Sequence, residues 1–215
     1  MSDSKLPQTF LFGFLFLLAF LGLAYLASFA EFQKQTALPP LGKISDFTLT
    51  NQDGKVTTLA DLTNHVWVAD IIFTRCAGPC PRMTAQMKDV ENKLPASSNA
   101  KLVTLTTDPD FDSPEILKRY GEHFGADFNR WTFLTGTKSE IGALAANSLK
   151  LSAKPIDPKD QKNAADLFIH TTIFVVVDKH AQLRGIFQTG GDDVDWTNDV
   201  EPRLIKTVHR LEREP

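Results

Sequence analysis

The feature that most constrains this chain is a nearly continuous apolar run at residues 66–73, which leads into a short turn containing its only two cysteines. A run of this length and composition predicts a strand buried on both faces of a sheet. The two cysteines fall where this strand is expected to pass into a helix. At such a place, backbone N–H groups and the helix dipole favour the thiolate. The predicted helix packs on the sheet through residues spaced three and four apart, which are Cys80, Met83, Met87, Val90 and Leu94.

Strand-like and helix-like segments alternate through most of the chain. An Asp-Gly turn between 47–50 and 55–58 predicts a β-hairpin. A long irregular segment at 151–166 precedes a predicted central strand at 168–178, and long loops of this kind are often functional. The other predicted elements are strands at 101–107 and 131–134, helices at 113–124, 138–149 and 196–211, and a strand that ends at Phe187. This order predicts an α/β domain with parallel neighbouring strands.

The N-terminal part of the chain predicts a membrane anchor. Residues 10–30 carry no charge and no proline, and as a helix they would span about 31 Å, which matches a bilayer core. The apolar stretch of a cleaved signal peptide is shorter, although Ser28-Phe29-Ala30 would suit a cleavage site. We expect a cytoplasmic leader at 1–9, a single transmembrane helix at 10–30, a tether at 31–43 and a folded domain at 44–215. The expected location is a bacterial inner membrane, with the C-terminal domain in the periplasm.

The charge distribution excludes one class of partner. The formal net charge is −3 over 215 residues, and acidic and basic residues are mixed throughout. A nucleic-acid-binding domain would concentrate Lys and Arg on one face or in one run. We therefore expect no nucleic-acid partner.

Several motifs in combination identify a family resemblance. The hairpin, the strand that feeds a cysteine turn, and the late strand with its hairpin resemble the thioredoxin fold. Within that superfamily the chain is similar to the Sco/SenC family, membrane-tethered copper proteins that help assemble the dinuclear copper site of cytochrome c oxidase. The matching motifs, within 46–187, are Phe73-Thr74-x-Cys76-x-x-x-Cys80-Pro81, Asp108-Pro109-x-x-Asp112-Ser113-Pro114-Glu115-x-Leu117-x-x-Tyr120, Leu134-Thr135-Gly136-Thr137 and His170-Thr171-Thr172.

The resemblance implies a copper site made by Cys76, Cys80 and His170. The donor chemistry agrees, because soft sulfur favours Cu(I), and two sulfurs with one nitrogen also hold Cu(II). A closed structural zinc site usually needs four ligands, and there is no further cysteine to supply them. Asp108 and Asp112, which follow a predicted strand, would either orient the cysteine loop or serve only in turns and helix capping. The family often has Pro-Asp inside the cysteine loop, whereas this loop reads Ala77-Gly78-Pro79.

Two functional classes stay open at this point. The first is a copper-binding assembly protein whose partners are the copper subunit of cytochrome c oxidase, a copper donor protein and a thiol reductant. The second is a thiol-disulfide oxidoreductase, with Cys76 as the attacking thiol and Cys80 as the resolving one. A peroxiredoxin is disfavoured, because Thr74 is only two residues before Cys76. A purely structural disulfide is also disfavoured, because closing so short a loop removes little chain entropy.

Overall fold

The computed structural model describes residues 8–36, 38–151, 153–155, 168–170 and 172–215. Most of the predicted leader and of the predicted loop at 151–166 lies outside these residues. The chain divides into two compact units, Met1–Pro39 and Pro40–Pro215. The described part of the first unit contains the helix α1 (Gln8–Thr36). Among the described residues, no helix meets the length and apolarity required of a membrane span.

The second unit alternates strands and helices, as the sequence predicts. Its elements are β1 (Gly42–Lys43), β2 (Thr48–Asn51), β3 (Val56–Thr58), η1 (Leu59–Asp61), β4 (Trp67–Ile72), α2 (Pro79–Lys93), β5 (Lys101–Thr106), α3 (Pro114–His123), β6 (Trp131–Thr135), α4 (Lys138–Gly142), η2 (Ala143–Ser148), β7 (Ala153–Pro155), β8 (Phe168–His170), β9 (Ile173–Val177), β10 (Gln182–Gln188), η4 (Trp196–Val200) and α5 (Glu201–Arg213). The predicted hairpin is β2 and β3, which pair in antiparallel register.

The main sheet is mixed, with eight strands in the order β1-β10-β9-β4-β5-β6-β2-β3. β4, β5 and β6 are parallel, which confirms the predicted parallel neighbours at the centre. The expectation fails towards both edges, where β9 is antiparallel to β4 and β2 is antiparallel to β6. The β2–β3 and β9–β10 pairs are antiparallel because their connections are too short for a parallel crossover.

The predicted central strand at 168–178 is wrong as a single element. Its second part is β9, which lies between β10 and β4 in the main sheet. Its first part is β8, which pairs with β7 in a separate two-stranded sheet, with Ala153 opposite His170. The two parts are divided because they pair with different strands, and a continuous apolar pattern does not reveal that choice.

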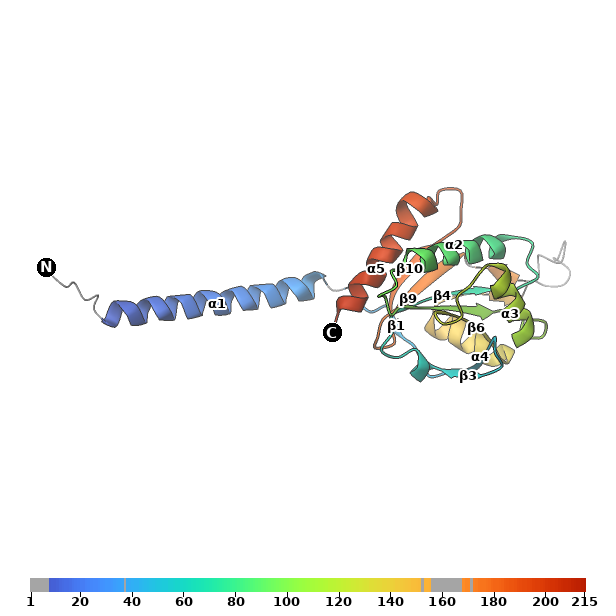
Figure 1. Ribbon diagram of the computed structural model, residues 1–215, viewed down its shortest axis with the longest axis horizontal. Coiled ribbons are helices and arrows are strands. Elements are labelled where there is room, and N and C mark those ends of the chain that lie inside the picture. The colour runs from blue at the N-terminus through green and yellow to red at the C-terminus, as the bar shows by residue number, and fades with distance from the viewer. Residues whose placement is uncertain (1–7, 37, 152, 156–167, 171) are drawn as a thin grey trace. The chain divides into compact units, whose positions relative to one another are not determined.

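Helices cover the main sheet on both faces (Figure 1), with α2 and α5 on one side and α4 on the other. Alternation along β4 assigns its side chains to the two faces. Trp67, Ala69 and Ile71 join a buried cluster with Ile141 of α4. Val68, Asp70 and Ile72 therefore point to the opposite face, which α2 covers with residues that include the fully buried Met83 and Met87. The cysteine turn thus lies on the α2 side of the sheet.

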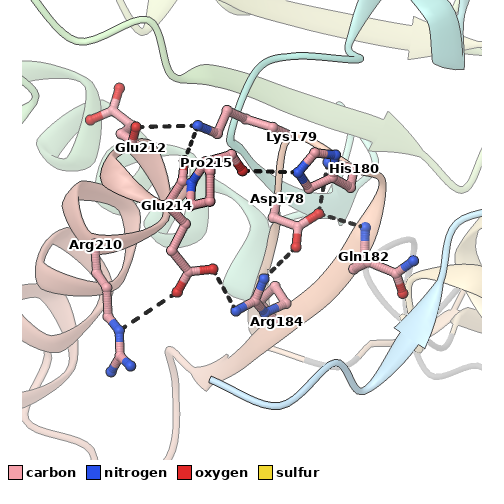
Figure 2. A network of polar contacts seen from close by, with 9 residues as sticks. All are labelled: Asp178, Lys179, His180, Gln182, Arg184, Arg210, Glu212, Glu214 and Pro215. Atoms are coloured by element: carbon pink, nitrogen blue, oxygen red, sulfur yellow. Dashed lines mark hydrogen bonds and ion pairs between the residues drawn. The ribbon is translucent and has the colours of Figure 1, made fainter. Parts of the chain in front are cut away.

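The C-terminal end of α5 is attached to the β9–β10 hairpin by a network of ion pairs and hydrogen bonds (Figure 2). Arg184 of β10 lies between two carboxylates, at 2.5 Å from Asp178 and 2.7 Å from Glu214. Lys179 donates to the main-chain oxygens of Glu212 and Glu214. Since the Arg184 side chain is only 10% exposed, this network is largely shielded from water.

Candidate thiol and metal site

The two cysteines lie where the sequence predicts, between the end of β4 and the first turn of α2. Gly78 is the N-cap of α2, and Pro79, which needs no N–H partner, is its first residue. The Cys76 N–H donates to the Phe73 carbonyl at 3.3 Å, which tightens the turn. Both thiols are buried in an apolar cluster with Ile72 and Phe73, against which Tyr120 packs.

The two cysteines are not joined by a disulfide, and their thiols lie in different surroundings. Cys76 is 5% exposed and Cys80 is fully buried. The Gly78 N–H donates to Cys76 Sγ at 3.3 Å, which favours negative charge on that sulfur. The hydrogen bond to Cys76, followed by burial, raises the pKa of the Cys80 thiol. The expectation that the helix N-terminus favours the thiolate therefore fails at Cys80. The hydrogen bond between Cys80 and Cys76 and the burial of Cys80 outweigh the helix dipole.

Asp112 binds the residues around the turn rather than capping a helix. Its carboxylate accepts the Thr74 N–H at 3.2 Å, and it also accepts the hydroxyls of Thr74 and Thr106. Asp112 is fully buried, and this burial raises its pKa although the three donors act in the opposite direction. The cap of α3 is Ser113, whose Oγ accepts the Ile116 N–H at 3.4 Å. Of the two roles open for Asp112, the geometry favours orienting the cysteine turn.

Asp108 contacts the residue that precedes Cys76. Its Oδ2 accepts from Arg75 Nε at 2.8 Å and lies 2.7 Å from Arg75 Nη2. The Arg75 guanidinium carbon also lies 4.6 Å from the centre of the Phe111 ring. Neither Arg75 nor Phe111 stands out in the sequence, because a lone arginine beside a cysteine carries no signal of either contact.

Asp70 is a fully buried carboxyl group in the middle of β4. Its Oδ1 accepts the Thr104 hydroxyl at 2.7 Å, and its Oδ2 has no hydrogen-bond partner among the described residues. Burial raises the pKa of Asp70 to about 7. Negative charge on Asp70 also contributes, as a smaller effect, to the raised pKa of Cys80. The sequence offers one signal of this group, which is the single charged residue inside an apolar run.

His170, the predicted third ligand, is described by its main chain alone. It is the last residue of β8 and lies opposite Ala153 of β7. Within the part of the chain that the structure describes, no three His, Cys, Asp or Glu side chains are grouped so as to hold a metal ion. The structure therefore brings Cys76 and Cys80 together, and His170 as their partner stays a prediction.

A mixed sheet whose central strand ends in a thiol pair at the start of a helix defines a thioredoxin-like domain. Residues 36–204 match the SCO1/SenC family model, so the chain belongs to the SCO1/SenC family. It is 35% identical over 158 residues to the SCO1 protein homolog of Bacillus subtilis (strain 168), covering 71% of this chain and 79% of that protein.

Solved structures agree with this assignment. BsSco, described as a member of the Sco family of cytochrome c oxidase assembly proteins with a disulfide switch, matches with a TM-score of 0.66 and 31% identity, over 82% of this chain and 97% of BsSco. The copper-bound ScoI of Bradyrhizobium japonicum matches with a TM-score of 0.64 over 79% of this chain and 99% of ScoI. At 19% identity, ScoI supports the shared fold alone.

Proposed function

We propose that this chain is a copper-binding protein of cytochrome c oxidase assembly, with Cys76, Cys80 and His170 as its ligands. The observation that carries the proposal is the contact between two buried sulfurs at the start of α2. Two cysteine sulfurs suit copper, because thiolate ligands select Cu(I) over harder cations. Membership in the Sco family agrees with this role. The partners would be the oxidase copper subunit and a copper donor protein.

The residues around Cys76 and Cys80 affect how readily the two thiols bind a soft metal. Ligation requires both thiols without their protons, and the raised pKa of Cys80 makes its proton hard to remove. Copper affinity should therefore fall as the pH is lowered. The Gly78 N–H stabilises charge on Cys76, and Asp112 holds Thr74 in place two residues before it. A disulfide between the cysteines would remove both ligands, so a thiol reductant must act before copper is loaded.

The ligand set is tested by titrating the full chain with copper. The chain is first purified in detergent and reduced under anaerobic conditions. Wild type should bind one copper ion, and Cys76→Ser, Cys80→Ser and His170→Ala should each lose the sulfur-to-copper charge-transfer absorption. His209→Ala is the matched control, because His209 belongs to α5 and contacts Glu212. A His170→Ala protein with the wild-type spectrum and affinity would show that the proposed ligand set is wrong.

The inequality of the thiols also favours a second function, thiol-disulfide exchange. The Cys76 thiolate would attack a disulfide sulfur of a partner and form a mixed disulfide, and the partner's other sulfur would leave as a thiol. The Cys80 thiolate would then attack Cys76 Sγ, which releases the partner's second thiol. A wild-type protein that reduces a protein disulfide but retains no copper would make this the primary function. Either function needs the same reduced pair.

We also propose that residues 10–30 anchor the chain in a bacterial inner membrane, with 31–43 as the tether and the domain in the periplasm. The uncharged composition and the length of the apolar run support this proposal. Carbonate extraction of membranes, followed by protease treatment of spheroplasts, tests it. The chain should stay in the pellet, and the domain should be digested from outside. Release into the carbonate supernatant would contradict the anchor.

A further inference from the structure

A chain of two hydroxyl groups connects α3 to the main chain of Cys80. The Thr84 hydroxyl donates to the Cys80 carbonyl at 3.0 Å, one turn earlier in α2. The same Thr84 oxygen lies 2.8 Å from the Tyr120 hydroxyl. A carbonyl oxygen only accepts hydrogen bonds, so the single hydroxyl hydrogen of Thr84 is used in the bond to Cys80. Tyr120 must therefore be the donor to Thr84, and the direction runs from Tyr120 through Thr84 to Cys80.

The Tyr120 ring lies against the thiol pair. It packs on the apolar cluster of Ile72, Phe73, Cys76 and Cys80. The rings of Phe124 and Phe133 also contact it, with centroids at 4.9 Å and 6.4 Å. Thr84 is fully buried, and Tyr120 is half-buried. The ring thus stands between solvent and the inner part of the cluster.

The position of α3 is fixed independently of this contact. A Cβ atom at Gly121 would lie 2.8 Å from Phe128 Cε1 and 2.9 Å from Phe133 Cε2, so only glycine allows this close approach to β6. At the other end of the helix, Asp112 holds the preceding loop to Thr74. These two constraints place the residue before Gly121 within reach of Thr84.

We propose that Tyr120 is a positioning residue that acts through Thr84 to keep Cys80 as the inner, shielded sulfur of the pair. An incoming soft sulfur ligand of a copper partner, or a disulfide sulfur of a partner to be reduced, then meets Cys76 first. The fully buried Cys80 and the slightly exposed Cys76 agree with this order. The inference rests on the proposed function only in taking these two thiols as the working pair.

Site-resolved alkylation of the reduced, copper-free full chain in detergent tests the proposal. Initial rates at Cys76 and Cys80 are measured with iodoacetamide and peptide mass spectrometry. Wild type should react mainly at Cys76. Tyr120→Phe removes one hydrogen bond and should raise the ratio of the Cys80 rate to the Cys76 rate by about fivefold, whereas Thr84→Val removes two and should raise it by at least as much. Thr84→Ser restores the hydroxyl and should return the wild-type ratio.

Phe124→Leu is the matched control, because Phe124 touches the Tyr120 ring but has no part in the hydroxyl chain. It should lower stability without changing the ratio. The proposal is overturned if Phe124→Leu changes the ratio as much as Tyr120→Phe does, or if Tyr120→Phe and Thr84→Val both keep the wild-type ratio. Both of those variants preserve side-chain shape closely enough to fold. No copper enters this assay, so its outcome is separate from the failure or success of the ligand titration.

Discussion

The main-chain N–H of Thr74 donates to Asp112 Oδ2 at 3.2 Å, and the Thr74 hydroxyl donates to the other oxygen of the same carboxylate. One side chain from the loop before α3 therefore holds the segment that joins β4 to Cys76. The Thr106 hydroxyl, at the end of β5, donates to this carboxylate as well. The ends of two neighbouring parallel strands thus share one acceptor beside the thiol pair.

Asp112→Ala should destabilise the reduced domain by about 2–4 kcal/mol, because it leaves the Thr74 N–H and the hydroxyls of Thr74 and Thr106 without this acceptor. Asp112→Asn keeps one acceptor oxygen and should cost less. Equilibrium urea unfolding followed by circular dichroism measures both changes. Asp110→Ala is a suitable control, since the side chain of Asp110 is 71% exposed. An Asp112→Ala protein as stable as the control would mean that this carboxylate does not fix the turn.

Asp70→Asn should reduce the pH dependence of stability. The pKa of Asp70 is raised from 3.8 to about 7 in the folded state, so folding favours its protonated form. This contribution is complete below about pH 4 and is lost as the pH rises to about 7, and the total loss is about 4 kcal/mol. Wild type should therefore lose stability relative to Asp70→Asn across this window. Unfolding free energies at a series of pH values measure the difference, with the exposed Asp192→Asn as control. A constant difference from pH 4 to pH 7 would contradict the raised pKa.

Two glycine substitutions should act in opposite directions. Gly121→Ala should destabilise by about 1–3 kcal/mol, because its methyl group would collide with Phe128 and Phe133 and force α3 outward. Gly142→Ala should stabilise by about 0.5–1 kcal/mol, because Gly142 has helical dihedral angles and nothing within 4 Å of its Cβ position. Thermal and urea unfolding check both. Equal effects of the same sign would show that α3 does not depend on close approach at Gly121.

Arg184→Ala should destabilise by about 2 kcal/mol, chiefly because it leaves the nearly buried Asp178 without its charged partner. The pair with Glu214 adds less, since Glu214 is 28% exposed. Arg203→Ala breaks an exposed pair with Asp199 and should change stability by less than about 0.5 kcal/mol. Urea unfolding of both variants makes the comparison. Similar small losses in both would show that the network in Figure 2 does not stabilise the end of α5.

Local periodicity was enough to predict β4, the cysteine turn and α2, because these elements are adjacent in sequence and each has its own apolar pattern. The division between β8 and β9 could not be predicted in this way. Residues 168–178 read as one apolar strand, and only the choice of partner, β7 for the first part and β4 for the second, separates them.

The parts of the site that the sequence does not predict are contacts between residues far apart in the chain. Asp70 meets Thr104 only because the parallel register places these residues side by side. Tyr120 reaches Thr84 only because Gly121 lets α3 approach β6. Neither the register nor the helix-to-sheet distance can be read from a single sequence. Cys76 and Cys80 could be predicted because both members of the pair belong to one short turn.

The strand that leads into the cysteine turn, β4, lies between β5 and β9, and Ala69 is matched with Val175 in that sheet. A ribosome makes β4 about 100 residues before it makes β9, so β4 waits for its second neighbour during synthesis. The main sheet, on which α2 packs, is incomplete during all of that time. Newly made chains should therefore be more open to oxidation at Cys76 and Cys80 than finished ones. We therefore expect the thiols to depend on a reductant from early in the biogenesis of the protein, before any metal has been delivered.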